Sequence, residues 1–435
     1  MSQLALGLDL GSSGLRLALA EATPGGGAQL LDERSSPYPR PFADPNGWRD
    51  GLLDLVARLD PVQRAQVGAI AIAGTSGTLL RCRPDGEPLD GAPLSSDAGL
   101  ALPYHLSCPE QAELAARLCG DPASPAASAS GSLARALRLI SAAGTTPFLL
   151  RHQADWLMGW LLGDRRWGEE GNNLRLGWDL QRQAWSGAIA QQSWAAALPV
   201  IRRSGSDLGT ICPSVAHRLG LPHTCRVVAG STDANAGVLA ADPQEGDGIT
   251  VLGTTLVLKQ FVAAPISAPG VSCHRVGGRW LLGGASNAGA GILRRFFSDA
   301  EIAELSRQID PRRPSGLDLL PLPARGERFP VDDPDLEPRL EPRPVSDALY
   351  LQALLEGLTE LERQGWQRFA ALGVPPLRRV LTLGGGARNP QWRLLRQQAL
   401  GVPVLQRPTC SAALGMARLA LRRAGRMEGP ADAKR

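Results

Sequence analysis

Two short turns rich in glycine and hydroxyl side chains are the segments of this chain best suited to chemistry. The first, Gly11-Ser12-Ser13-Gly14, stands between two apolar runs, and the second, Gly253-Thr254-Thr255, stands in the same setting about 240 residues later. Backbone N–H groups and hydroxyls in such turns suit phosphate oxygens. A plain hairpin turn has the same composition. Because the turn occurs twice, we weigh phosphate binding and a plain hairpin turn equally. The recurrence also indicates a duplicated architecture.

Two aspartates, Asp9 and Asp233, stand at the ends of predicted strands beside small residues. Two further turns, 74–78 and 384–389, also follow predicted strands. Ligands gather at strand ends in open α/β folds, so these residues are candidates for a site. A carboxylate there can accept a proton or hold a cation, whereas the alternative is an aspartate that starts a turn or caps a helix.

The elements around these turns alternate between apolar strands and amphipathic helices. Strands are expected at 4–10, 15–21, 67–73, 225–229, 249–252, 256–261 and 379–383. Helices are expected over 109–162 with a loop at 123–132, over 350–372 and over 412–424, and 310–344 is expected to be irregular. This alternation predicts an α/β fold. The glycine turns follow a strand–turn–strand order without GxGxxG spacing, which excludes a Walker P-loop and a dinucleotide fingerprint.

Length and charge set limits on the class of protein. A chain of 435 residues is expected to form two or three domains. Its 46 basic and 42 acidic residues give a net charge of +4, which does not support a nucleic-acid or membrane-surface partner. Hydrophobic content of 43% and charged content of 20% are typical of a soluble globular protein.

The N-terminus and the cysteines bear on compartment. The first residues lack a basic region, so no signal peptide is expected, and no apolar run reaches the ~18 residues of a spanning helix. The seven cysteines are scattered and contain no CxxC, which argues against a zinc site or redox pair. We therefore expect a cytoplasmic protein, or one in a stroma-like compartment of an organelle.

Taken together, the motifs resemble the FGGY carbohydrate kinases of the actin-like ATPase superfamily. The matching segments are Gly7-Leu8-Asp9-Leu10-Gly11-Ser12-Ser13, residues 229–236 around Asp233, Gly253-Thr254-Thr255, and residues 384–392 followed by Gly401-Val402-Pro403-Val404. The resemblance implies two actin-like, ribonuclease H-like domains that flank a cleft and close on their substrates. It places the sugar-binding domain at 1–232, with helix 411–425 packed back on it, the nucleotide-binding domain at 233–410, and a flexible tail at 426–435.

Within that family the chain is most similar to the compact plant and cyanobacterial branch, described as D-ribulose kinases and sometimes labelled xylulose kinases. The segments that carry this similarity are 74–78, 155–157, 172–177 and 326–330. It implies phosphorylation of D-ribulose to D-ribulose 5-phosphate, with D-xylulose and glycerol as rival acceptors. A non-catalytic sugar or nucleotide sensor and an actin-like structural element remain alternatives on the same fold. Nothing in the sequence indicates the oligomeric state.

The resemblance also implies roles on the sugar side. Asp233 is expected to be the general base, and Asp9 is expected to lie near Mg²⁺ through water and to contact the sugar together with Asp233. Ser76 and Asp97 are further expected sugar contacts. Around Asp97, the segment Ser95–Gly99 lacks the aromatic and the arginine found in many members of the family.

On the nucleotide side the resemblance implies ATP as cofactor. The transferred phosphate is expected to contact Gly11, Ser12 and Ser13 from one domain and Gly253 and Thr254 from the other. The adenosine is expected to contact Gly385, Gly386 and Asn389. Trp392 is equally compatible with packing on the nucleotide and with the core. The stretch 409–413 lacks the acidic residue that many members carry before the last helix.

Overall fold

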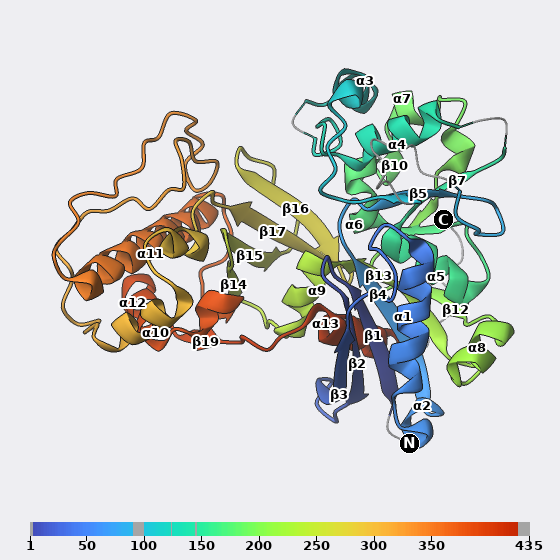
Figure 1. Ribbon diagram of the computed structural model, residues 1–435, viewed down its shortest axis with the longest axis horizontal. Coiled ribbons are helices and arrows are strands. Elements are labelled where there is room, and N and C mark those ends of the chain that lie inside the picture. The colour runs from blue at the N-terminus through green and yellow to red at the C-terminus, as the bar shows by residue number, and fades with distance from the viewer. Residues whose placement is uncertain (1–2, 90–99, 123, 144–145, 425–435) are drawn as a thin grey trace. The chain divides into compact units, whose positions relative to one another are not determined.

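The computed structural model describes residues 3–89, 100–122, 124–143 and 146–424, which form two compact units (Figure 1). The first unit contains the chain up to Ala240, the turn Arg275–Gly278 and the segment from Ser411 onward. The second contains Ala241–His274 and Arg279–Cys410. The boundary falls after Ala240, so the helix that begins at Asp233 belongs to the first unit. The expected tail at 426–435 lies outside the described residues.

The first unit is built on a mixed sheet with the strand order β12-β13-β4-β1-β2-β3. Its strands are β1 (Leu4–Leu10), β2 (Leu15–Ala22), β3 (Ala28–Ser36), β4 (Val67–Gly74), β12 (Asp207–Thr210) and β13 (Arg226–Thr232). Strands β1, β4 and β13 run parallel, and Gly74 pairs with Leu10 on one side and Thr232 on the other. The carboxyl ends of these three strands therefore meet at one edge of the sheet.

Helices cover both faces of this sheet. Leu6, Leu8 and Leu10 of β1 pack into one core with Trp48 and Trp156, which lie in α1 (Pro45–Ala57) and α5 (Gln153–Leu162). Side chains alternate along a strand, so Gly7 faces the other side. A Cβ at Gly7 would lie 1.9 Å from the carbonyl of Ala413 in α13 (Ala412–Ala424). Helix α13 therefore packs directly on the backbone of β1, beside α9 (Asp233–Ala240).

The remainder of the first unit is a collection of smaller elements. A short sheet has the order β6-β5-β7, with β5 (Leu79–Cys82), β6 (Ala101–Leu102) and β7 (Leu149–His152). Two short strand pairs are β8 (Trp167–Glu169) with β11 (Val200–Arg202), and β9 (Trp178–Asp179) with β10 (Ala184–Trp185). The other helices are α2 (Pro61–Arg64), α3 (Ala112–Cys119), α4 (Ser132–Ser141), α6 (Glu170–Asn173), α7 (Gly187–Ala190) and α8 (Pro213–Leu219). Strand β7 interrupts the region 109–162 that was expected to be helical.

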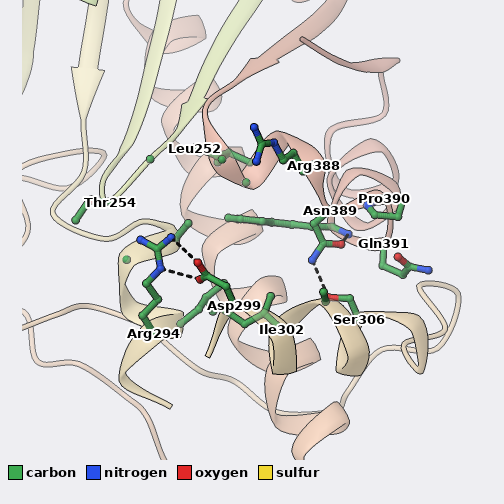
Figure 2. Close-up of a pocket in the computed structure, with 18 of the residues that line it drawn as sticks. Leu252, Thr254, Arg294, Asp299, Ile302, Ser306, Arg388, Asn389, Pro390 and Gln391 are labelled. Carbon is green, nitrogen blue, oxygen red and sulfur yellow. Dashed lines mark hydrogen bonds and ion pairs between the residues drawn. The ribbon is translucent and has the colours of Figure 1, made fainter. Parts of the chain in front are cut away.

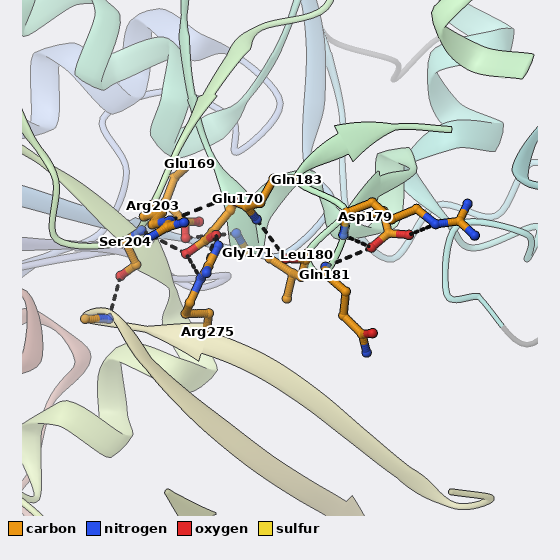
Figure 3. Close-up of polar contacts among 12 residues, drawn as sticks. Glu169, Glu170, Gly171, Asp179, Leu180, Gln181, Gln183, Arg203, Ser204 and Arg275 are labelled. Atoms are coloured by element: carbon orange, nitrogen blue, oxygen red, sulfur yellow. Dashed lines mark hydrogen bonds and ion pairs between the residues drawn. The ribbon is translucent and has the colours of Figure 1, made fainter. Parts of the chain in front are cut away.

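A buried ion pair organises the first unit around α6 (Figure 3). Arg275 donates to both carboxylate oxygens of Glu170, at 2.6 Å for the shortest contact, and Glu170 is fully buried. Ser204 donates its backbone N–H to the same carboxylate, and its hydroxyl accepts the N–H of Gly277. The neighbouring Glu169 accepts two backbone N–H groups and caps α6. These contacts explain why the turn Arg275–Gly278 belongs with the first unit.

The second unit repeats the central pattern of the first. Its sheet has the order β16-β17-β15-β14-β18-β19, with β14 (Asp247–Leu252), β15 (Leu256–Val262), β16 (Val271–Val276), β17 (Arg279–Ala285), β18 (Arg379–Leu383) and β19 (Val404–Gln406). Strand β14 pairs antiparallel with β15 and parallel with β18, as β1 does with β2 and β4. The expected duplication of a strand–turn–strand unit is therefore present in the fold.

Three helices, α10 (Asp299–Arg307), α11 (Asp347–Ala371) and α12 (Pro390–Leu400), contribute to the core of the second unit. Leu252, Leu258, Trp366, Phe369 and Trp392 are among its buried side chains. Residues 310–344 form turns and isolated bridges, as expected. Among the helices of the described chain, none is long and apolar enough to cross a membrane.

Candidate functional site

Two carboxylates lie at the carboxyl ends of parallel strands in the first unit. Asp9 is the penultimate residue of β1, and Asp233 follows the last residue of β13 at the start of α9. Burial raises the pKa of Asp9 to about 7, and the charge of Asp233 is the next cause, while Arg16 opposes the shift. The charge of Asp233 therefore acts on Asp9 and disfavours its ionisation.

The carboxylate of Asp9 fits a magnesium ion. The Oδ1 atom of Asp9 is buried and has no hydrogen-bond partner among the described residues, so it is an acceptor with no proton donor. The described residues contain no group of three or more histidine, cysteine or acidic side chains that could hold a metal by themselves. Mg²⁺ at phosphate sites needs only one or two carboxylates, because phosphate and water supply the other ligands. Asp9 could therefore hold Mg²⁺ when a phosphate substrate is bound.

Asp233 occupies the first turn of α9 and is partly exposed. Its Oδ1 atom accepts the N–H of Ala234 at 2.7 Å. A carboxylate at a helix N-terminus is stabilised in its charged form by the helix dipole. The position is compatible with both roles considered for this residue, a helix-start aspartate and a general base.

The turn between β1 and β2 departs from expectation at one residue. The Gly11 N–H donates to the carbonyl of Gly14 at 3.0 Å and closes the turn. This amide was expected to hold phosphate, but its proton is already used within the turn. Ser12 and Ser13 lie exposed at the tip, so their hydroxyls are the groups of this turn that can reach a ligand. The turn between β14 and β15 has the same feature, because the Gly253 N–H donates to the carbonyl of Thr255 at 3.1 Å while Thr254 is exposed.

The turn after β4 lies between the two aspartates, because β4 is the strand between β1 and β13. Thr75 and Thr78 are buried, and their hydroxyls bond to each other at 2.6 Å. Ser76 is half-buried, so it is the hydroxyl of this turn that a ligand can contact. The remaining expected sugar contact, Asp97, lies outside the described residues. Asp9, Ser76 and Asp233 thus belong to three adjacent strand ends.

A cavity of about 730 Å³ lies within the second unit (Figure 2). Three segments line it: the β14–β15 turn, residues 290–307 with α10, and the turn that leads into α12. It brings together all the expected nucleotide contacts of the second half: Gly253, Thr254, Gly385, Gly386 and Asn389. A concave site of this size can hold a molecule as large as a nucleotide.

Close packing explains the glycine at the inner wall of this cavity. A Cβ on Gly386 would lie 2.7 Å from the Cβ of Leu252 and 2.8 Å from the ring of Trp392. Trp392 is itself 1% exposed, and its indole N–H donates to Thr359 at 3.1 Å. Trp392 therefore belongs to the core, and it also lines the cavity. A Cβ on Gly385, by contrast, would meet nothing within 4 Å, so this glycine presents open backbone to the cavity.

Asn389 holds two walls of the cavity together. Its Oδ1 atom accepts the N–H of Trp392 at 3.0 Å and caps α12, and its Nδ2 atom donates to the Ser306 hydroxyl at 2.8 Å (Figure 2). This motif residue therefore links α10 to α12. Sequence reasoning expected a ligand contact for Asn389, and a single motif does not show which distant side chain this residue meets.

Several lining residues carry charge and were not predicted. Arg294 and Arg388 line the cavity together with Asp299, and Arg294 bonds to Asp299 at 2.8 Å (Figure 2). This bond lowers the pKa of Asp299. Arg294 and Asp299 lie in segments without recognisable spacing, and Arg388 lies in the 384–392 motif with no role assigned to it, so only the fold shows that they share a site. Their guanidinium groups suit an anionic ligand.

Comparison with protein families finds one match within the second half of the chain. Residues 248–424 match the model of the FGGY family of carbohydrate kinases, C-terminal domain. An L-fuculokinase of Escherichia coli K12 is 23% identical over 287 residues, and one of Salmonella typhi is 24% identical over 282. The match to the former spans 59% of this chain and 58% of the relative's length.

Solved structures share the fold over nearly the whole chain. A xylulose kinase from Rhodospirillum rubrum has a TM-score of 0.76 at 20% identity, covering 98% of this chain and 91% of that one. A xylulose kinase from Bifidobacterium adolescentis has a TM-score of 0.74 at 20% identity, covering 99% and 94%. A Plasmodium falciparum glycerol kinase with ADP has a TM-score of 0.74 at 14% identity, covering 96% and 89%. The expected two-domain α/β fold of the sugar kinases is therefore confirmed.

Proposed function

We propose, because residues 248–424 match the model of the FGGY carbohydrate-kinase C-terminal domain, that this protein is an ATP-dependent sugar kinase. The observation that carries the proposal is the pair of carboxylates, Asp9 and Asp233, at the ends of β1 and β13 on either side of β4 in the first unit. A non-catalytic binder needs neither a proton acceptor nor a buried carboxylate oxygen without a donor. The cavity of the second unit supplies the complementary site for the nucleotide.

The chemistry follows from the needs of an alcohol acceptor. A sugar hydroxyl is a poor nucleophile, so a carboxylate must accept its proton as the oxygen attacks the γ-phosphorus of ATP. Asp233 is the proposed acceptor of that proton. The new bond joins the sugar oxygen to phosphorus, the bond to the β-phosphate oxygen breaks, and ADP leaves. Ser76 and Asp9 are proposed to orient the sugar, and Ser12 and Ser13 to donate hydrogen bonds to the phosphoryl oxygens.

Asp9 is proposed to hold Mg²⁺, which neutralises phosphate charge when it is bound. Arg294 and Arg388 are proposed to favour the polyphosphate by their charge. Leu252, Leu293 and Ile302 provide apolar lining that suits a base and ribose. The cofactors of the proposed reaction are thus ATP and Mg²⁺.

The proposed substrate is D-ribulose, with D-ribulose 5-phosphate as product. Support comes from the segments that resemble the compact ribulose-kinase branch, one of which forms the half-buried turn of Ser76. Rival acceptors are D-xylulose and glycerol, which are also the substrates in the names of two structural neighbours, and L-fuculose, from the curated relatives. These polyols differ by hydroxyl configuration or chain length, so a few polar contacts decide between them.

The test is ADP release by the purified full chain with ATP and Mg²⁺. D-ribulose, D-xylulose, L-fuculose and glycerol are compared with a control that contains no sugar. Turnover highest on D-ribulose is expected. Turnover highest on another polyol would retain the kinase and replace its substrate. Absence of sugar-dependent turnover, with ATP still bound, would replace the kinase with a sensor.

A further inference from the structure

A chain of hydrogen bonds links two turns of the first-unit site. The Thr75 hydroxyl donates to Gln153 Oε1 at 2.8 Å, and Gln153 Nε2 donates to the Tyr38 hydroxyl at 3.4 Å. Tyr38 in turn donates to the carbonyl of Gly11 at 2.8 Å. The chain therefore runs from the turn after β4, which carries Ser76, to the turn after β1, which carries Ser12 and Ser13.

Each donor in this chain of hydrogen bonds has only one acceptor to which its proton can point. The single phenolic proton of Tyr38 points to a carbonyl, which cannot donate, so the Tyr38 oxygen must accept from Gln153. This fixes the Gln153 amide with Oε1 toward Thr75, which supplies both its hydroxyl and its N–H, the latter at 3.1 Å. The Thr75 proton is then used, so Thr78 must donate to Thr75, and Thr78 accepts the N–H of Tyr104 at 3.1 Å. One consistent orientation extends over the whole chain.

The surroundings keep this orientation rigid. Gln153 is completely buried and begins helix α5, and Thr75 and Thr78 are buried with it. The Tyr38 ring packs edge-on against Phe42 with centroids 5.5 Å apart. Buried polar groups that are fully paired specify one arrangement, because breaking any one bond leaves a buried group unsatisfied.

Tyr38 also lies beside the reacting groups of the proposed kinase. Burial raises the pKa of its hydroxyl far above the ordinary value, and the charges of Asp9 and Asp233 raise it further, while the Gln153 bond lowers it. Tyr38 therefore stays neutral and remains a donor. None of its hydrogen bonds uses the carboxylates, since its proton is given to Gly11.

We propose that Tyr38 and Gln153 are positioning residues that fix the distance between the turn of Ser12 and Ser13 and the turn of Ser76. This inference rests on the proposed function, in which the first turn binds the transferred phosphoryl group and the second binds the sugar. Tyr38 and Gln153 thereby set the distance between the acceptor hydroxyl and the phosphorus, and their own side chains contact neither of these groups. A displacement of about 1 Å between reacting groups can cost up to a hundredfold in rate.

The test is Tyr38→Phe, which removes one hydroxyl and keeps the ring. Its matched control is Tyr350→Phe in the second unit, where a buried tyrosine also donates to a backbone carbonyl, that of Leu340, at 2.9 Å. Wild type and both variants are measured for kcat and KM with each substrate, for sugar-independent ATP hydrolysis and for thermal unfolding. Gln153→Met, which removes the central link at similar volume, is the second variant.

Tyr38→Phe is expected to lower kcat about tenfold and to raise the ratio of ATP hydrolysis to sugar phosphorylation, with the KM for ATP unchanged. Tyr38→Phe and Tyr350→Phe are expected to lower thermal stability by similar amounts, and Tyr350→Phe is expected to leave kcat unchanged. Gln153→Met is expected to behave as Tyr38→Phe does, and the double variant no worse than the more impaired single one. Full kcat in Tyr38→Phe, or equal losses in Tyr38→Phe and Tyr350→Phe, would overturn the inference and leave the kinase intact. Wild-type protein without sugar-dependent turnover would overturn both.

Discussion

A buried ion pair at the centre of the second unit provides a quantitative test of the fold beneath the cavity. Arg396 of α12 donates two hydrogen bonds to Glu362 of α11, at 2.5 and 2.8 Å, and both side chains are at most 1% exposed. Thr250 of β14 donates to the same carboxylate, and Arg396 also donates to Thr382 of β18. The pair therefore connects two helices to two neighbouring strands.

The perturbation is Glu362→Gln, which keeps the shape and removes the charge. An Oε1 atom remains to accept from Thr250, but the Arg396 guanidinium is left buried with no carboxylate. Breaking a buried pair in this way costs roughly 3–5 kcal/mol, because the desolvated charge has lost its counterpart. Since about 1.4 kcal/mol is tenfold in an equilibrium constant, the folded-to-unfolded ratio of this unit should fall by about a hundredfold or more.

The assay is urea unfolding followed by tryptophan fluorescence, because Trp366 and Trp392 lie in this core. The matched control is Asp299→Asn, which breaks the ion pair to Arg294. The side chains of Arg294 and Asp299 are 66% and 71% exposed. Solvent screens an exposed pair and leaves it little net effect on stability, so the control should unfold close to the wild-type midpoint. Equal midpoints for Glu362→Gln and Asp299→Asn would refute the reasoning.

Two further predictions concern packing and pH. Gly386→Ala should lower the thermal unfolding temperature of the ligand-free protein, because its Cβ would lie within 3 Å of Leu252 and Trp392, whereas Gly385→Ala should not; equal unfolding temperatures would contradict this. Burial raises the pKa of Asp155 from 3.8 to about 7, so between pH 4 and pH 7 the native state binds more protons than the unfolded state. The contribution of Asp155 to the free energy of unfolding is therefore present below about pH 4 and is lost as the pH rises through 7. Urea unfolding should therefore show the stability advantage of wild type over Asp155→Asn shrinking between pH 4 and 7. A constant difference would contradict the assignment. Burial lowers the pKa of His152 to about 3, so its contribution to stability changes with pH in the opposite direction, but His152 is present in both proteins.

The sequence predicted those elements whose signal is local. Apolar runs located β1 and β2 to within a residue, because both strands are buried along most of their length. Strand β3 was missed, since it is an edge strand with mostly exposed, polar side chains. Strand β7 was missed because Leu149–His152 runs into α5 without a glycine or proline to separate them.

In the candidate site, too, the sequence predicted only the residues whose signal is local. Motif spacing identified Asp9, Asp233 and the glycine turns, but it did not show that the Gly11 amide closes its own turn. Tyr38 and Gln153 carry no motif, and they meet across 115 residues of chain. Contacts of that kind depend on sheet order, which local composition does not encode.

The measurement that tests the central claim most directly is sugar-dependent ADP release by wild type and Asp233→Asn, with ATP binding measured on both. The variant keeps the shape of the side chain and cannot accept the hydroxyl proton. General-base catalysis contributes about a hundredfold to ten-thousandfold, so the variant should lose at least a hundredfold in kcat and still bind ATP. Wild-type turnover that depends on sugar and is retained in full by Asp233→Asn would contradict the account.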